Sequence, residues 1–166
     1  MRKFLACIGV LSIVVGATSP ALAGPEPDST ILRVVREYRN TTWHYESVMG
    51  TPRTPFRIAA DVFALRTRWR TTEQRTLRVF RTGPAHRRQW LCIHHFEGSW
   101  RDPNPPYYGG LQMDISFQRA YGPLLLRIKG TANHWTPLEQ MWVAERAYRT
   151  RGFYPWPNTA RDCGLI

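Results

Sequence analysis

A Gly83-Pro84 pair divides this 166-residue chain into two parts whose folding signals differ. Glycine readily ends a helix and proline cannot continue one, so no helix is expected to run through this point. Upstream, apolar residues recur at helical spacing, whereas downstream glycine, proline and aromatic residues are frequent. The sequence therefore predicts a mainly α fold: a leader over residues 1–23, a basic amphipathic helical hairpin over residues 24–83 and a small compact domain over residues 84–166.

The upstream part is expected to contain two amphipathic helices. The first follows a cluster of capping residues at 28–30 and stops at Gly50. The second is expected to take Thr54 as its N-cap, with a proline in its first turn, and to end at Gly83. The short connection 50–53 would let the two helices fold back on each other.

The first 23 residues have the three parts of a secretory leader. Arg2 and Lys3 supply positive charge, residues 4–15 form an apolar run too short to cross a membrane, and residues 21–23 form a small-x-small cleavage site. The mature chain is expected to begin near Gly24 and to be secreted.

Two cysteines remain once the leader, which contains Cys7, is removed. Exported proteins meet an oxidising compartment, so Cys92 and Cys163 are expected to form a disulfide, with two free thiols as the alternative. The bond would close a loop of roughly 70 residues and would stabilise the fold by about 4 kcal/mol in the chain-entropy model.

Positive charge is concentrated in the upstream part. Residues 31–88 contain 13 arginines and four acidic residues, a net charge of +9, whereas residues 89–166 carry a net charge of +2. Such an arginine-rich face predicts contact with anionic polymers. The alternative is that the arginines only keep this face of the helices solvated. No nucleic-acid-binding motif accompanies the charge, so no nucleic-acid partner is expected.

The downstream part predicts short helices joined by turns, because its helical stretches are interrupted by proline and glycine. The expected elements are a helix over 89–97, an irregular segment over 98–106, a turn or short hairpin over 107–111, a helix capped by Asp114 or Ser116 that runs to Gly122, and a helix that starts at Thr136-Pro137 with Glu139 in a capping box and runs to about Thr150.

Glu97 is the main candidate for catalysis. It ends an apolar helical stretch and is expected to face a glycine-rich, aromatic turn, surroundings that keep a carboxyl group protonated for glycoside cleavage. The alternative is a surface glutamate, although a negative charge at a helix C-terminus opposes the helix dipole. Asp102 and Asp114 are candidates for a second carboxylate, and Asp114 is equally a candidate helix cap.

Residues near Glu97 are candidates for binding a sugar. Aromatic rings can lie against sugar faces, glycine lets a backbone approach a sugar ring closely, and an amide can hydrogen-bond an N-acetyl group. The alternative for the aromatic residues is core packing, and the alternative for the glycines is a tight turn. The candidates are Trp100, Tyr107, Tyr108, Gly109, Gly110, Gln112, Asp114 and Tyr121, with Trp156 as a further aromatic one.

No metal and no cofactor is expected. His94 and His95 are adjacent on a predicted helix, so their side chains point about 100 degrees apart, and the remaining histidines are scattered along the chain.

The order of these pieces resembles a known family. From about Trp90 to Cys163 the chain resembles the catalytic domain of the resuscitation-promoting factors, secreted members of the lysozyme-like lytic transglycosylase superfamily. The matching pieces are Cys92 before the turn Glu97-Gly98-Ser99-Trp100, the run 107–112, Tyr121-Gly122, Glu139-Gln140, the run 143–146, and Trp156-Pro157 with Cys163. The family usually places its cysteine directly before the glutamate, whereas Cys92 stands five positions earlier.

The resemblance implies a small lysozyme-like helical fold with a cleft and a short β lip. It implies Glu97 as the general acid and base, and the bond between N-acetylmuramic acid (MurNAc) and N-acetylglucosamine (GlcNAc) of peptidoglycan as the bond cleaved, by transglycosylation or by hydrolysis. A monomer associated with the cell wall is then expected. The alternatives are a non-catalytic wall-glycan-binding or signalling protein and a cationic extracellular protein that acts on membranes or nucleic acid.

Overall fold

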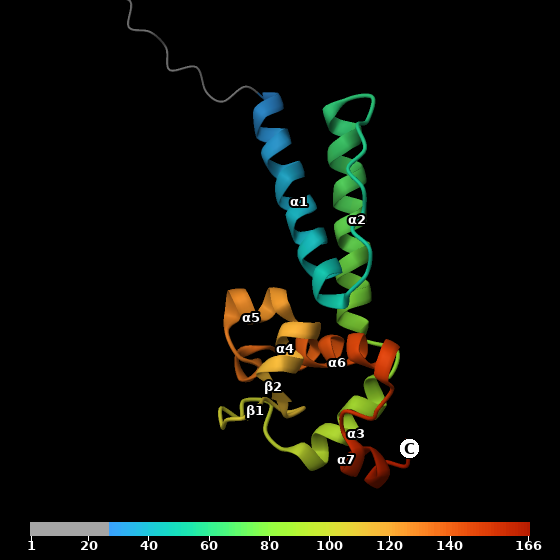
Figure 1. Cartoon of the computed structure of the whole chain (residues 1–166). Coiled ribbons are helices and arrows are strands. Elements are labelled where there is room, and N and C mark those ends of the chain that lie inside the picture. The colour runs from blue at the N-terminus through green and yellow to red at the C-terminus, as the bar shows by residue number, and fades with distance from the viewer. Residues whose placement is uncertain (1–26) are drawn as a thin grey trace, which may run out of the picture.

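The computed structural model describes residues 27–166, so the predicted leader, its cleavage site and Cys7 lie outside the described residues. Figure 1 shows two long helices standing on a body of shorter helices and one small sheet, which confirms the mainly α prediction. In chain order the elements are α1 (Pro27–Met49), α2 (Val62–Thr82), α3 (Arg87–Glu97), β1 (Tyr107–Tyr108), β2 (Met113–Asp114), α4 (Ile115–Tyr121), α5 (Pro123–Lys129), the 3-10 helix η1 (Ala132–His134), α6 (Pro137–Arg151) and α7 (Pro157–Asp162). Among these helices of residues 27–166, none combines the length and apolar composition needed to cross a membrane.

Helices α1 and α2 fold back on each other, as predicted, but the hairpin is continuous with the body. Its outer part has a small core of its own, in which Val35 of α1 packs with Leu65 and Trp69 of α2. At its inner end, Val48 and Phe80 belong to the main core, together with residues of α3, α4 and α6. The inner end of the hairpin and the body therefore share the main hydrophobic core.

The predicted start of the second helix is wrong. Asp61 is the N-cap of α2, where its side chain accepts a hydrogen bond from the Ala64 amide at 2.8 Å, and the connection from α1 spans residues 50–61. Thr54 lies in that connection, because its amide and its hydroxyl both donate to the buried Glu46 carboxylate of α1. These two bonds hold Thr54 against α1, and α2 begins only at Val62.

Helix α6 caps the C-terminal ends of both hairpin helices. The Arg146 guanidinium donates to the Ser47 carbonyl at 3.0 Å, and the Arg149 guanidinium donates to the carbonyls of Met49 and Gly50. The Trp142 indole N–H donates to the Phe80 carbonyl near the end of α2. The last carbonyls of a helix lack partners within the helix, so these bonds fix where the hairpin stands on the body. Burial lowers the pKa of Arg146, and the positive charge of Arg149 lowers it further.

The start of α6 confirms the predicted capping box. The Thr136 hydroxyl accepts a hydrogen bond from the Glu139 amide, while the Glu139 carboxylate accepts one from the Thr136 amide. The same buried carboxylate forms an ion pair with Lys129 of α5 at 2.7 Å. Glu139 therefore has a structural role, which agrees with its interpretation as a cap.

Buried polar side chains of α6 set the position of α3 and of the loops around it. The Glu145 carboxylate accepts hydrogen bonds from the Trp90 indole at 2.8 Å and from the amide of His86, the N-cap of α3. Gln140 accepts a bond from the Gly110 amide and donates to the Trp100 carbonyl. These contacts position the helix that ends at Glu97.

Helices α5 and α7 were not predicted from the sequence. Each has a proline at its first position, Pro123 and Pro157, where the ring fixes a helical φ and the missing N–H costs nothing. They contain seven and six residues, too few for an apolar repeat to be recognised.

Candidate active site

Glu97 is the last residue of α3, and α7 holds its side chain. The Thr159 hydroxyl of α7 donates to Glu97 Oε1 at 2.8 Å. The predicted disulfide is present: Cys92 of α3 is bonded to Cys163, the residue that follows α7, with a Cα–Cα distance of 6.1 Å. The bond and the hydroxyl contact together fix α7 against the helix that carries Glu97. The glutamate is half-buried.

A cavity of about 200 Å³ opens beside Glu97. Its walls come from the β lip, from the segment between α6 and α7, and from the start of α7. The lining residues are Glu97, Tyr107, Gln112, Pro155, Trp156, Pro157 and Asn158.

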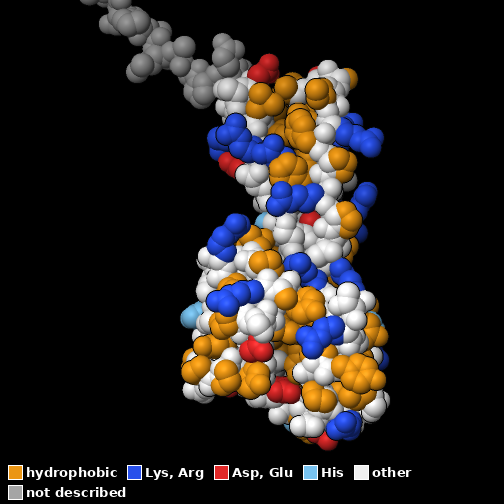
Figure 2. Space-filling model, viewed as in Figure 1, with side chains coloured by type: hydrophobic (Ala, Val, Ile, Leu, Met, Phe, Trp, Pro, Cys, Tyr) orange, Lys and Arg blue, Asp and Glu red, His pale blue; other side chains and the backbone are white. Residues whose placement is uncertain are grey.

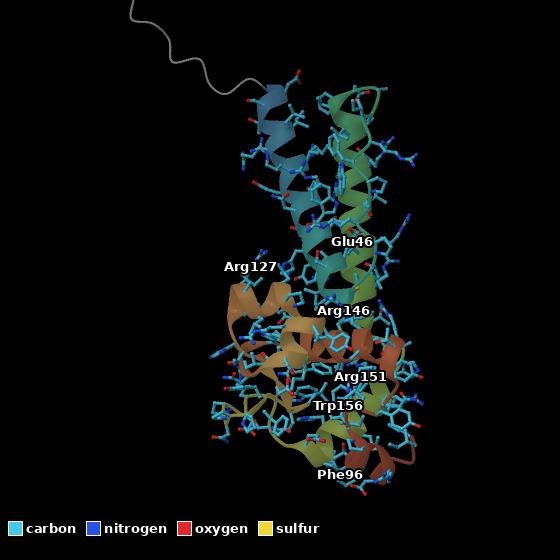
Figure 3. All side chains as sticks on the ribbon, viewed as in Figure 1. Glu46, Phe96, Arg127, Arg146, Arg151 and Trp156 are labelled. Atoms are coloured by element: carbon cyan, nitrogen blue, oxygen red, sulfur yellow. A yellow bond between two sulfur atoms is a disulfide. The ribbon has the colours of Figure 1, made fainter. Side chains whose placement is uncertain are left out.

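A second cavity of about 310 Å³ adjoins the first, because both are lined by Tyr107, Gln112, Pro155 and Trp156. It continues along α4 to the end of α6. Its further lining residues are Met113, Asp114, Ser116, Phe117, Ala120, Tyr121 and Arg151. The two cavities form one open groove, which we call the Glu97 groove, and Figure 3 marks Trp156 and Arg151 within it.

Trp156 is the buried wall that the two cavities share. Its indole N–H donates to the Leu111 carbonyl at 2.7 Å, and its ring packs edge-on against Trp90 and Phe117. The ring is thereby fixed in the core, while the groove reaches one of its surfaces. Trp156 provides a rigid apolar wall rather than a mobile side chain.

The predicted β lip is present, and it separates the two adjacent tyrosines. Strands β1 and β2 pair antiparallel, with Tyr107 opposite Asp114 and Tyr108 opposite Met113. Successive side chains of a strand point to opposite faces. Tyr107 is accordingly exposed at the Glu97 groove, whereas Tyr108 is half-buried against the main core. Only Tyr107 of this pair lines the groove.

Gly109 and Gly110 lie in the turn between these strands, but they are buried and do not line the groove. A Cβ atom at Gly109 would stand 2.5 Å from Gln140 Oε1, and one at Gly110 would stand 2.5 Å from His94 Nδ1. Gly109 also has a φ of +72°, a backbone conformation that favours glycine. Close packing behind the lip thus requires the two glycines. This agrees with the alternative interpretation, in which they form a tight turn and do not contact a sugar.

Gln112 does line the groove, with part of its amide already engaged. Its Nε2 donates to Asp102 Oδ2 at 2.8 Å and to the Gly109 carbonyl at 3.0 Å. Among the described residues, its side-chain oxygen has no hydrogen-bond donor and is therefore the atom left to meet a ligand. The hydrogen bond from Gln112 is the main cause that lowers the pKa of Asp102. Asp102 does not line the groove and supports Gln112 instead.

Asp114 is the N-cap of α4, as one of its two interpretations predicts. Its Oδ1 accepts hydrogen bonds from the Ser116 hydroxyl at 2.6 Å and from the Phe117 amide at 2.7 Å, and these bonds lower its pKa. Asp114 lines the second cavity but not the one beside Glu97.

Of the two remaining candidates, one lines the groove. Tyr121 lines the second cavity. Trp100 lies behind the lip, where its ring stacks on His94 with the ring centres 3.8 Å apart. His94 Nδ1 lies 3.0 Å from the Gly110 carbonyl, so this histidine also packs behind the lip. Within residues 27–166, no group of three or more histidine, cysteine, aspartate or glutamate side chains is arranged to hold a metal ion.

Several polar residues of this site were not predicted from the sequence, and Thr159 and Arg151 are two of them. Thr159 contacts Glu97 directly, and Arg151 brings a positive charge to the end of the groove away from Glu97. Arg151 is the last residue of α6, and Thr159 belongs to a helix that was not predicted. Each approaches the site from an element distant in sequence, and the local sequence gives no signal of that approach.

No family model, curated protein or solved structure matches this chain. Conclusions about its function therefore depend on the chemistry of the groove.

Proposed function

We propose that this protein is a secreted, lysozyme-like enzyme that cleaves the MurNAc–GlcNAc bonds of peptidoglycan, with Glu97 as general acid and base. The observation that carries the proposal is a single acid at one end of a groove walled by Trp156, Tyr107 and the Gln112 amide. Aromatic surfaces with a few polar groups that fix orientation are typical of sites that bind sugars. The resemblance over residues 90–163 names the same glutamate.

Glu97 would act through the carboxylate oxygen that Thr159 leaves free. Thr159 holds Oε1, and Oε2 can then donate a proton to the glycosidic oxygen as the C1–O bond breaks. The oxocarbenium-like centre that forms at C1 is attacked by a hydroxyl group, whose proton returns to Glu97. The enzyme is thereby restored in its starting protonation state.

The surroundings of Glu97 favour an internal nucleophile. None of the other described residues lining the cavity beside Glu97 is acidic, and Asp114 lines only the adjoining cavity. A retaining hydrolase normally supplies a second carboxylate near the first. In its absence the 6-hydroxyl of the same muramic acid is the simpler nucleophile, which gives a 1,6-anhydro end. Water would give a reducing end.

The disulfide supports export. Such bonds persist in oxidising compartments, and the bond between Cys92 and Cys163 joins the two helices at the proposed catalytic end of the groove. An exported protein can reach the cell wall. There the arginines of residues 31–88 would contact anionic wall polymers.

Replacing Glu97 tests the proposal. Glu97→Gln keeps the size of the side chain and removes its acid, so release of dye from labelled peptidoglycan should fall by at least about 100-fold. Asp162→Asn is the matched control, since it removes an exposed carboxylate at the end of α7 and should leave the rate unchanged. Equal rates for the parent and Glu97→Gln would contradict the assignment. Binding of glycan without release of new chain ends would identify a non-catalytic glycan-binding protein instead.

A further inference from the structure

A cavity of about 230 Å³ lies at the waist where the hairpin meets the body. It shares no lining residue with the Glu97 groove. In Figure 2 the molecule narrows between the hairpin and the body, and basic side chains lie on both sides of this waist. The lining residues are Asn40, Trp43, His44 and Ser47 of α1, Arg53 of the connection and Leu124 of α5.

The cavity offers hydrogen-bond donors, although the Ser47 hydroxyl already donates to the Trp43 carbonyl. Arg39 donates to Asn40 Oδ1 at 3.3 Å, which leaves the Asn40 amide N–H groups free to meet a ligand. Burial is the main cause that lowers the pKa of His44, so its ring is neutral at neutral pH and offers one N–H. None of the described residues that line the cavity is acidic. The nearby Glu139 carboxylate is paired with Lys129.

The lining residue Trp43 holds two arginines on its ring, and one of them, Arg53, also lines the cavity. Its indole N–H donates to the Thr54 carbonyl at 2.8 Å, which fixes the ring. The guanidinium carbons of Arg39 and Arg53 lie 4.7 Å and 5.5 Å from the ring centre. Arg39 Nε is buried and has no hydrogen-bond partner among the described residues. Arginines held on an aromatic ring lose less conformational freedom when they bind an anion.

A third arginine approaches from the body. Arg127 follows Leu124 by three residues on α5, so the two share one side of that helix. Figure 3 shows Arg127 at the side of α5 that faces the hairpin. Arg53 thus lines the cavity from the hairpin, and Arg127 lies next to its wall residue Leu124 on the body.

We propose that this cavity, which we call the waist site, binds the phosphate of a phosphodiester-linked wall polymer, independently of the Glu97 groove. Arg53 lines the cavity, Arg39 lies on the Trp43 ring beside it, and Arg127 belongs to α5, whose Leu124 lines the cavity from the body. The oxygens of a phosphodiester surround the phosphorus tetrahedrally, so they can meet donors that do not share one plane, whereas both oxygens of a carboxylate lie in one plane. The waist site would hold the enzyme on an anionic polymer while its groove meets a glycan strand.

Two double variants of equal charge test the waist site. Arg53→Gln with Arg127→Gln changes the site, whereas Arg66→Gln with Arg75→Gln removes the same charge from exposed positions of α2 that line neither the waist site nor the groove. The probes are fluorescent poly(glycerol phosphate), polygalacturonate as a carboxylate polymer, and dextran as a neutral one, and fluorescence anisotropy gives the dissociation constant.

The site variant should bind poly(glycerol phosphate) roughly tenfold more weakly than the parent, because charged hydrogen bonds are lost, and the control variant should lose no more than about twofold. The parent should prefer the phosphate polymer to polygalacturonate and should not bind dextran. Equal weakening in the two double variants would show binding by bulk charge and would overturn the proposal, as would equal affinity for the carboxylate polymer. Glu97→Gln should bind like the parent, so this result does not depend on the proposed cleavage activity.

Discussion

Removal of the disulfide should lower the stability of the fold by an amount that the structure defines. Cys92 and Cys163 are 71 residues apart, and the chain-entropy model gives about 4 kcal/mol for closing a loop of this length. In a protein of this size, each kcal/mol shifts the melting temperature by about 2 to 4 °C. The double variant Cys92→Ala with Cys163→Ala should therefore melt about 8 to 16 °C below the parent.

Thermal unfolding followed by circular dichroism, with and without reductant, measures this change. The reduced parent should melt together with the double variant, and reductant should have no effect on the variant. A variant that melts within about 2 °C of the parent would refute the argument, because the bond would then leave the entropy of the unfolded chain nearly unchanged.

Three further predictions follow from individual contacts. Thr159→Val removes the hydroxyl that holds Glu97, so kcat on peptidoglycan should fall about tenfold with KM unchanged. Steady-state dye release measures both constants, and an unchanged kcat would contradict this positioning role. The lowered pKa of Asp114 means that its charged form stabilises the fold at neutral pH, and this contribution is lost as the pH falls through the lowered pKa. The melting temperature of Asp114→Asn should therefore fall less than that of the parent between about pH 4 and pH 2. Parallel curves of melting temperature against pH for the two proteins would count against the argument. Arg149→Met removes both bonds to the end of α1 and should lower the free energy of unfolding by about 1 kcal/mol in urea titrations, whereas an unchanged midpoint would show that these bonds contribute nothing.

Local signals predicted much of the helical structure. The first helix stops before Gly50 as expected, and the cap at Asp114 and the capping box at Thr136 mark the starts of α4 and α6. The predicted start of α2 at Thr54 was wrong because Thr54 bonds to Glu46, an acid on another helix. A contact between residues brought together by the fold leaves no local pattern in the sequence.

The candidate site shows the same division between local and long-range information. The strand period explains why Tyr107 lines the groove and Tyr108 does not, although both follow the same proline-rich segment. The packing role of Gly110 depends on Gln140 and His94, which approach from α6 and α3. Sequence alone identified the turn, and only the fold shows which of its faces meets the groove.

Product analysis tests the central claim most directly. Purified peptidoglycan is incubated with the parent protein or with Glu97→Gln, and mass spectrometry of the soluble fragments identifies new chain ends. The account predicts fragments with 1,6-anhydro-MurNAc ends from the parent and none above background from Glu97→Gln. Equal amounts of new ends from both proteins would contradict the role of Glu97, and no new ends from the parent would contradict the proposed cleavage.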